Sequence, residues 1–232
     1  MGKETNKMKE HPILFKPHMA QGVHDRLKTM TRRICKVQPT NPTYKLMRLI
    51  ESTNREIAKH NGLCYWGSLS HAEFFKCPYE IGDQLWVKEV HYAYGTWNTD
   101  GYTNEGRLEF RFEDFSALDH PICFPINKPD TILPNFTKSL GYFKRNSLFM
   151  PKKHCRTWLE ITGIRVERLQ DISEEDAEKE GIDFLRYYPD VDETLTAKEL
   201  FQCLWDSINL TLGHGWDKGD WVWAYEFKRI EK

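Results

Sequence analysis

The stretch HDRLKTMTRR, from His24 to Arg33, concentrates amine, hydroxyl and guanidinium groups. Lys28 and Thr31 lie three residues apart in it, and Arg32 and Arg33 follow. A lysine whose pKa is lowered by burial can act as a base, and a threonine hydroxyl can be the nucleophile that it activates. Two arginines can bind a phosphate through paired N–H donors. The stretch is therefore either a solvated edge or a site that binds, and hydrolyses, an anionic ligand.

Lys28 lies where a predicted helix gives way to a predicted strand. The helix begins at Pro17 and has an apolar face with four-residue spacing, and the residues from Thr29 to Ile34 alternate as in a strand. This junction would partly desolvate the amine of Lys28 and lower its pKa. A lysine at a helix C-terminus also stabilises the helix dipole, so a purely structural role is the competing interpretation.

Glu180 is the candidate partner of this lysine. The segment SEEDAEKEG predicts a short helix, with Ser173 as its N-cap and Gly181 just past its end. Glu180 then falls in the last turn, where the helix dipole disfavours a carboxylate. A nearby cation such as Lys28 or Arg33 would compensate that charge, whereas a solvated glutamate needs no partner.

Basic and aromatic residues elsewhere could complete a binding site. The second basic group would form a wall that faces Arg32 and Arg33, and it consists of Lys144, Arg145, Lys152, Lys153 and Arg156. Trp86 belongs to a set of aromatic residues that could stack on bases. Solvated strand faces explain basic groups of this kind equally well. Trp205, Trp221 and Trp223 have the spacing of packing residues.

The composition limits the functional class. The chain has 232 residues, of which 40% are hydrophobic, and this predicts one domain with a substantial core. A formal net charge of −1 argues against a uniformly basic surface for duplex DNA. The six cysteines include no C-x-x-C pair, so we expect free thiols, a cytoplasmic location and no signal peptide, metal or cofactor. No apolar run is long enough to cross a membrane.

The remaining elements are expected to be short strands and few helices. Strands are predicted over 12–15, 84–90, 107–112, 156–169 with a kink at Gly163, and 220–230, and helices over 46–58 and 197–209. Residues 92–148 otherwise lack a regular pattern, as expected for a lid or binding loop. Without a repeated βαβ unit, this pattern predicts a small mixed barrel.

The order of several motifs resembles that of a known family. LKTMTRR, IGDQLWVKE, RVERLQDISEEDAEKEGI, LWDSIN and WVWAYEFKRI together resemble the ASCH domain proteins of the PUA-like superfamily, especially the long members from phages and prophages. The resemblance covers 12–34, 77–89 and 150–230, and it leaves about 37–76 and 91–149 as insertions. It implies an α+β fold, a small mixed β-barrel with flanking helices and large inserted loops, in a single domain over 1–232.

The resemblance also implies a ligand and a chemistry. Small bacterial members hydrolyse the acetyl amide of N4-acetylcytidine, and their catalytic lysine, threonine and glutamate correspond to Lys28, Thr31 and Glu180. The arginine of the motif corresponds to Arg33, while Arg26 stands where the family usually has glycine. RNA or a modified pyrimidine nucleoside is the expected ligand, with Arg32, Arg33, Trp86, Lys152, Lys153 and Arg156 as its binding residues.

Two alternatives to an amidohydrolase stay open. One is a module that binds RNA or a modified base without catalysis. The other is a phage protein that engages a host protein partner through the insertions 37–76 and 91–149. Hydrolysis requires Lys28, Thr31 and Glu180 to converge, whereas a binding module requires only basic and aromatic groups.

Overall fold

The computed structural model describes residues 8–39, 45–48, 64–68, 71–75, 77–187 and 194–232. These residues group into two compact units. The first unit comprises Met1–Arg26, Gln84–Leu159 and Arg229–Lys232, and the second comprises Leu27–Asp83 and Glu160–Lys228. Each unit therefore combines segments that are far apart in the sequence, and the single domain stays a prediction.

One part of the first unit is built from two parallel strands and a helix. Strand β1 (Glu10–Leu14) pairs with β6 (Gln84–Lys88), and Ile13 lies opposite Val87. Alternate side chains of β6 are buried, as the two-residue period predicts. Helix α1 (Pro17–His24) starts with proline, whose fixed φ suits the first helical turn, and buries Met19, Ala20 and Val23.

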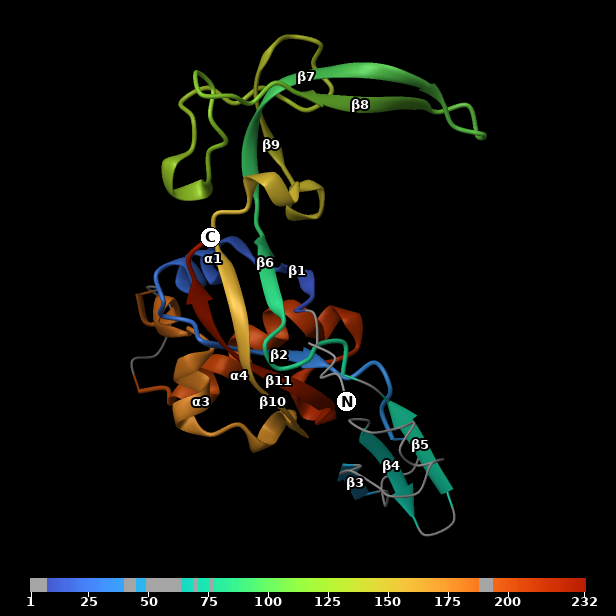
Figure 1. Ribbon diagram of the computed structural model, residues 1–232, viewed down its shortest axis with the longest axis vertical. Coiled ribbons are helices and arrows are strands. Elements are labelled where there is room, and N and C mark those ends of the chain that lie inside the picture. Colours follow the sequence, from blue (N-terminus) through green and yellow to red (C-terminus); the bar gives the residue numbers. More distant parts are fainter. Residues whose placement is uncertain (1–7, 40–44, 49–63, 69–70, 76, 188–193) are drawn as a thin grey trace, which may run out of the picture. The chain divides into compact units, whose positions relative to one another are not determined.

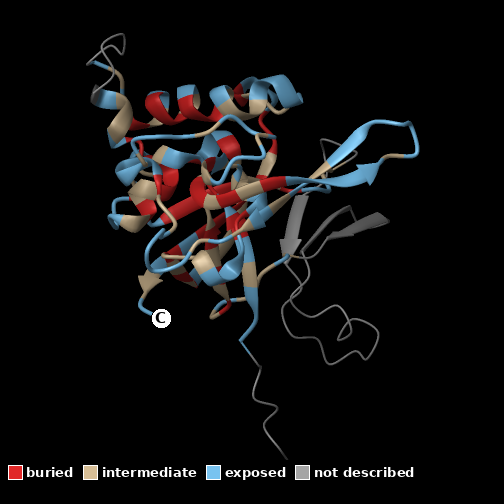
Figure 2. Ribbon diagram, turned by 90° about the horizontal axis from the view of Figure 1, so that it is seen from above, coloured by how far each residue is buried: buried red, intermediate tan, exposed pale blue. Residues whose placement is uncertain are grey.

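The other part of the first unit is a three-stranded antiparallel sheet in the order β8-β7-β9. Strand β7 (His91–Tyr102) pairs with β9 (Gly141–Arg145) along its first residues and with β8 (Leu108–Asp114) along the rest (Figure 1). The distal end of the β7–β8 hairpin is exposed, as the pale blue ribbon in Figure 2 shows.

This sheet corrects the expectation that 92–148 contains one strand. Gly95 suggested a break, but it lies within β7, where a Cβ would come 2.1 Å from the carbonyl oxygen of Glu113 and 2.7 Å from the Phe112 ring. The glycine therefore allows close packing between strands. Sequence periodicity alone cannot distinguish this use of glycine from a turn.

The second unit contains most of β10 (Trp158–Arg168) and of β11 (Trp221–Ile230) and all of β2 (Met30–Ile34), and these strands pair in the order β10-β11-β2. Strands β11 and β2 are antiparallel, and Tyr225 lies opposite Thr31. Helices α3 (Glu174–Lys179) and α4 (Ala197–Asn209) contact each other, and α3 contacts β2. The predicted helix over 197–209 is confirmed, and so is the final strand.

Alternation along the strands of the second unit produces two faces. Val222 and Ile34 pack with the helices in a core that includes Leu200, Phe201 and Trp205. Trp223 and Tyr225 pack on the opposite face with Cys35 and Tyr79. Neighbouring residues of β2 therefore experience different environments.

A small antiparallel sheet completes the described strands, with β3 (Lys45–Arg48), β4 (Cys64–Ser68) and β5 (His71–Phe75) in that order. The predicted helix over 46–58 is wrong at residues 46–48, where Leu46 pairs with Trp66 across two strands. The rest of that prediction lies outside the described residues.

Short 3-10 helices lie at Pro125–Asn127, Ser147–Phe149, Lys152–His154, Leu169–Asp171, Asp183–Tyr187, Leu210–Leu212 and Trp216–Lys218.

The mixed α+β class is confirmed, but the barrel is not. Among the described residues the strands form open sheets. Alternation of apolar and polar residues identifies a strand, whereas closure of a barrel depends on which edge strands pair, and no single segment of the sequence encodes that pairing.

The predicted kink at Gly163 is also wrong, because β10 continues through it. None of the helices in the described ranges is long and apolar enough to span a membrane.

Arg26, which occupies the place of the family glycine, has a left-handed backbone with φ +63°. This conformation brings a Cβ close to the following carbonyl oxygen and is unfavourable for residues other than glycine. The position thus keeps the backbone shape that glycine favours although its side chain is large. Arg26 contacts Glu231 at 3.4 Å, and both side chains are exposed.

We expect Arg26→Gly to be more stable than Arg26→Ala by about 1 kcal/mol, because only glycine relieves the left-handed backbone. Both variants lose the contact with Glu231, so their difference reports the backbone alone. Urea unfolding at neutral pH measures it. Equal stability of the two variants would show that the backbone of Arg26 carries no such cost.

Candidate functional site

Lys28 and Glu180 form a buried pair in the second unit. Their side chains are 0% and 2% exposed. The Lys28 Nζ atom donates to the Oε2 atom of Glu180 at 2.6 Å and to its main-chain oxygen at 2.7 Å. The predicted partnership between this lysine and this glutamate is therefore present in the fold.

The local structure explains why the two residues meet. Glu180 is the C-cap of α3, and Ser173 caps the other end by accepting a hydrogen bond from the Asp176 amide at 3.2 Å. The Thr29 amide donates to the Lys179 carbonyl oxygen at 3.0 Å, which joins the segment before β2 to the end of α3. Lys28 precedes β2, so it is free of the strand alternation that would otherwise direct it away from Thr31.

Gly181 is required at this junction for two reasons. Its φ of +73° lies in the left-handed region, and a Cβ at this position would come 2.8 Å from the Cβ of Lys28. A larger residue would be strained and would also displace the lysine stem. The helix ending predicted from Gly181 is confirmed, and the same residue makes room for Lys28.

Burial lowers the pKa of the Lys28 amine below its ordinary value, while the charge and hydrogen bond of Glu180 oppose this effect. Arg33 and Arg32 lower it further by repulsion. A neutral amine has two N–H donors and a lone pair, and the two Glu180 oxygens can accept both donors. Compared with a solvated lysine, Lys28 is thus shifted toward the neutral amine, which is the form that can take up a proton.

Arg32 is fully buried among carboxylates, which is a different place from the ligand-binding position expected for it. Its NH1 atom lies 3.0 Å from Oε1 of Glu180, and its NH2 atom lies 2.6 Å from Glu167 and 3.1 Å from Asp176. Three carboxylates therefore surround one guanidinium. This arrangement fits a residue that positions Glu180, and direct contact between Arg32 and a ligand stays a prediction.

Thr31 and Arg33 belong to the other face of β2. Thr31 is buried opposite Tyr225, and Arg33 is half-buried opposite Trp223. Burial lowers the pKa of the Arg33 guanidinium, while Glu180 and two tyrosines, Tyr79 and Tyr225, oppose this effect. The fold thus brings Lys28 and Glu180 into contact, and the convergence of Thr31 with them stays a prediction.

Aromatic rings line the face that carries Thr31 and Arg33. The Tyr79 ring meets the Tyr225 ring edge-on at 5.1 Å, and the Trp223 ring is stacked at 6.5 Å from Tyr225. Burial raises the pKa of the Tyr225 hydroxyl, which accepts a hydrogen bond from the Cys77 thiol at 3.7 Å. Trp223 packs in this cluster, as its spacing predicted.

Four predicted ligand-binding residues belong to the first unit. Trp86 is half-buried in β6, with the Lys88 ammonium 5.4 Å from its ring, and Lys153 is exposed. Lys152 forms an ion pair with Glu10. Arg156 binds buried Glu89 with two hydrogen bonds of 2.8 and 2.9 Å, so a carboxylate already occupies its paired donors. Ligand binding by these four residues stays a prediction.

Sequence reasoning missed several charged residues that extend the network around Arg32 toward the surface. Arg165 pairs with Glu167 at 2.6 Å and with Glu226 at 2.8 Å, and it also contacts Asp176. Gly163 leaves room for this network, since a Cβ there would lie 2.9 Å from a Glu226 oxygen. The alternation of Arg165 and Glu167 in RVER was a visible signal, but their partners depend on strand pairing.

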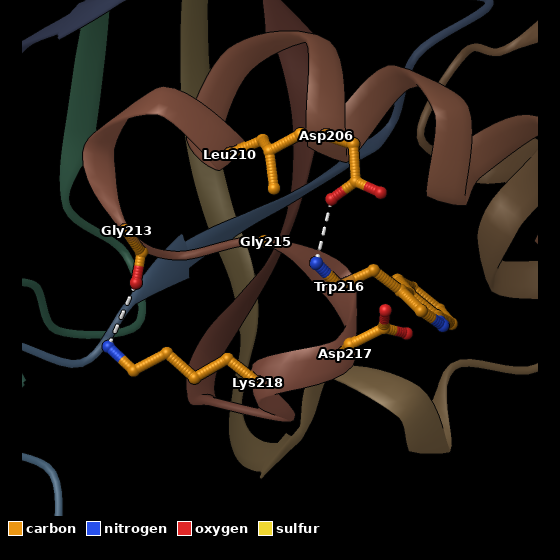
Figure 3. Close-up of a pocket in the computed structure, with 7 residues that line it drawn as sticks. All are labelled: Asp206, Leu210, Gly213, Gly215, Trp216, Asp217 and Lys218. Carbon is orange, nitrogen blue, oxygen red and sulfur yellow. Dashed lines mark hydrogen bonds between the residues drawn. The ribbon is translucent and has the colours of Figure 1, made fainter.

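A separate cavity of about 270 Å³ lies at the C-terminal end of α4 (Figure 3). It is lined by Asp206, Leu210, Gly213, Gly215, Trp216, Asp217 and Lys218. Asp206 accepts a hydrogen bond from the Trp216 amide at 2.7 Å, and Lys218 donates to the Gly213 carbonyl oxygen at 3.0 Å. These bonds close the loop, and none of the predicted site residues lines the cavity.

We expect Gly181→Ala to destabilise the protein by about 1–3 kcal/mol more than Gly213→Ala. Both glycines have a left-handed φ, +73° and +77°, but an added Cβ meets Lys28 only at residue 181 and nothing within 4 Å at residue 213. Denaturant unfolding of both variants measures the difference. Similar losses in the two variants would mean that the lysine stem moves aside without cost.

We expect the stability of the wild type relative to Lys28→Met to rise with pH as the pH approaches 10.5. The folded-state pKa of Lys28 lies below its ordinary value of 10.5, so the unfolded chain binds more protons in this range, and stability then increases with pH. The slope is at most about 1.4 kcal/mol per pH unit. Urea unfolding of both proteins between neutral and alkaline pH tests this, and a flat or falling difference contradicts it.

Comparison of the chain with protein-family models, curated proteins and solved structures finds no significant match. The resemblance to ASCH proteins therefore rests on the order of its motifs. The chemistry that the site can support follows from the contacts among Lys28, Arg32 and Glu180. These contacts combine a buried amine with a carboxylate that is held from two sides.

Proposed function

We propose that this protein is a PUA-like ASCH protein that binds RNA or a modified pyrimidine nucleoside and hydrolyses an amide of the N4-acetylcytidine type. The observation that supports this proposal most directly is the buried contact between Lys28 and Glu180, next to the strand that carries Thr31. Removing two ionisable side chains from water costs free energy, and an apolar pair of similar size would avoid that cost. Buried ionisable pairs are therefore candidates for groups that change their protonation state in a reaction.

The proposed reaction uses Thr31 as the nucleophile. Neutral Lys28 takes the proton of the Thr31 hydroxyl, and the oxygen attacks the acetyl carbonyl carbon. The amide C–N bond then breaks, the base nitrogen receives a proton, and the acetyl group is bound to Thr31 as an ester. Water hydrolyses this ester, which releases acetate and restores the hydroxyl.

Glu180 and the arginines have supporting roles in this proposal. Glu180 holds the Lys28 amine through two oxygens, and Arg32 holds the Glu180 carboxylate from the other side. Arg33 lies on the face of Thr31, where a guanidinium can bind a phosphate of the ligand. The two arginines also lower the pKa of Lys28 by charge repulsion, and this opposes Glu180, which raises that pKa.

A second candidate function is binding of a modified base without hydrolysis. Half-buried Tyr79 favours it, since this ring packs with Trp223 and Tyr225 on the face of β2 that carries Arg33. Aromatic stacking and one arginine are sufficient for recognition of a base with its phosphate. In this case Lys28 and Glu180 stabilise the fold and take no part in chemistry.

We expect Lys28→Ala and Thr31→Ala each to lower the rate of acetate release from N4-acetylcytidine at least about 100-fold. The double variant should be hardly slower than either single variant, because the two residues act as one unit. Glu180→Gln should also lower the rate, since it removes the charge that holds Lys28. Acetate release under saturating nucleoside measures all four variants.

Thr29→Ala and Lys179→Ala are matched controls, because both residues neighbour the site in sequence, Thr29 is exposed, and the side chain of half-buried Lys179 pairs with Glu175 and not with Glu180. They should retain the wild-type rate. Wild-type protein that binds the nucleoside but releases no acetate would favour the binding module. Wild-type protein that does not bind it would reject both functions for this nucleoside.

A further inference from the structure

Arg145, at the end of β9 in the first unit, lies among three aromatic rings. The guanidinium carbon is 4.2 Å from the ring centre of Phe112, 4.7 Å from that of Trp97 and 5.4 Å from that of Phe149. Trp97 and Phe112 are register partners on β7 and β8. Rings stacked on a guanidinium cover its faces and leave its N–H edge for other partners.

Among the described residues, no carboxylate forms an ion pair with Arg145. Within the described ranges the side chain makes no hydrogen bond or ion pair. Asp114 is the acidic group that acts on it electrostatically, but the Asp114 oxygens accept hydrogen bonds from the Ser116 amide at 2.9 Å and from His154 at 3.1 Å. Burial lowers the pKa of Arg145, and the attraction of Asp114 opposes this effect only in part, so the charge is partly desolvated.

Trp97 supplies a second donor in the same place. Its indole Nε1 atom is buried and has no hydrogen-bond acceptor among the described residues. Buried donors without an acceptor are rare in folded proteins and cost about 1–3 kcal/mol each. The Trp97 indole is therefore a buried unsatisfied donor beside Arg145, which is half-buried and makes no side-chain hydrogen bond within the described ranges.

We propose that Arg145, Trp97, Phe112 and Phe149 form a binding site for a phosphate group. The guanidinium edge offers paired donors that match phosphate geometry, and Phe149 is 64% exposed, so its ring can stack on a base. Exposed Lys144 adds a positive charge next to Arg145 in the sequence. The phosphate can belong to a nucleic acid strand or be a free ion, and the site is independent of Lys28 and Glu180.

The test uses the full chain and two probes, a labelled oligouridylate of about ten nucleotides and inorganic phosphate. Fluorescence anisotropy at several salt concentrations gives the affinity for the oligouridylate, and NMR follows the Arg145 Nε–H and Trp97 indole N–H resonances with each probe. We expect Arg145→Gln to weaken oligouridylate binding about tenfold and to reduce the salt slope by about 0.7, as for one lost phosphate contact.

Arg111→Gln is the matched control, because Arg111 is exposed on β8 and is not stacked on these rings. It should keep the wild-type affinity. Resonance shifts with inorganic phosphate alone would support the site and assign it to a free ion. No shift of these resonances with either probe would overturn the proposal, and so would oligouridylate binding by Arg145→Gln equal to that of the wild type without any shift by inorganic phosphate. If Arg145→Gln fails to fold, Arg145→Lys tests the same loss of paired donors while it keeps the charge.

Discussion

Burial of the Lys28 amine against Glu180 is the constraint on which the surrounding structure of the second unit depends. Moving a charged group out of water costs several kcal/mol, so the neighbours must supply compensation. Glu180 contributes both a carboxylate and a main-chain oxygen, and it can do so because it is the C-cap of α3. Gly181 then leaves space for the lysine stem. The end of one helix and the start of one strand are thus matched to a single side chain.

Arg32 extends this constraint through three elements. From β2 it reaches Glu167 on β10, and Asp176 and Glu180 at the two ends of α3. Its neighbour Arg33 points to the aromatic face, because adjacent residues of a strand alternate between faces. Two identical side chains therefore have separate roles. Arg32 holds the carboxylate of the site, and the proposed function assigns Arg33 to ligand binding.

The segment 91–149 has its own architecture in the first unit. Strands β7, β8 and β9 pack a cluster of rings around Arg145, and Gly95 permits the close approach of β8 to β7. Aromatic and glycine residues that look irregular along the chain are therefore the packing elements of a sheet. This arrangement places the Arg145 guanidinium beside exposed Phe149, far in sequence from the lysine site.

Local patterns in the sequence determined the elements whose signals lie within a few residues. Ser173 and Gly181 define α3, the apolar spacing defines α4, and alternation defines β2 and β11, because caps and periodicity act over one or two turns. The partnership of Lys28 with Glu180 was only a hypothesis at that level. The tertiary structure decided it, along with the open sheets, the strands of the insertion and the burial of Arg32. Those features depend on strand pairing and on contacts such as the one between residues 28 and 180, which are 152 positions apart. No local pattern encodes a contact of that separation, since it forms only when the packing of all the intervening segments is in place.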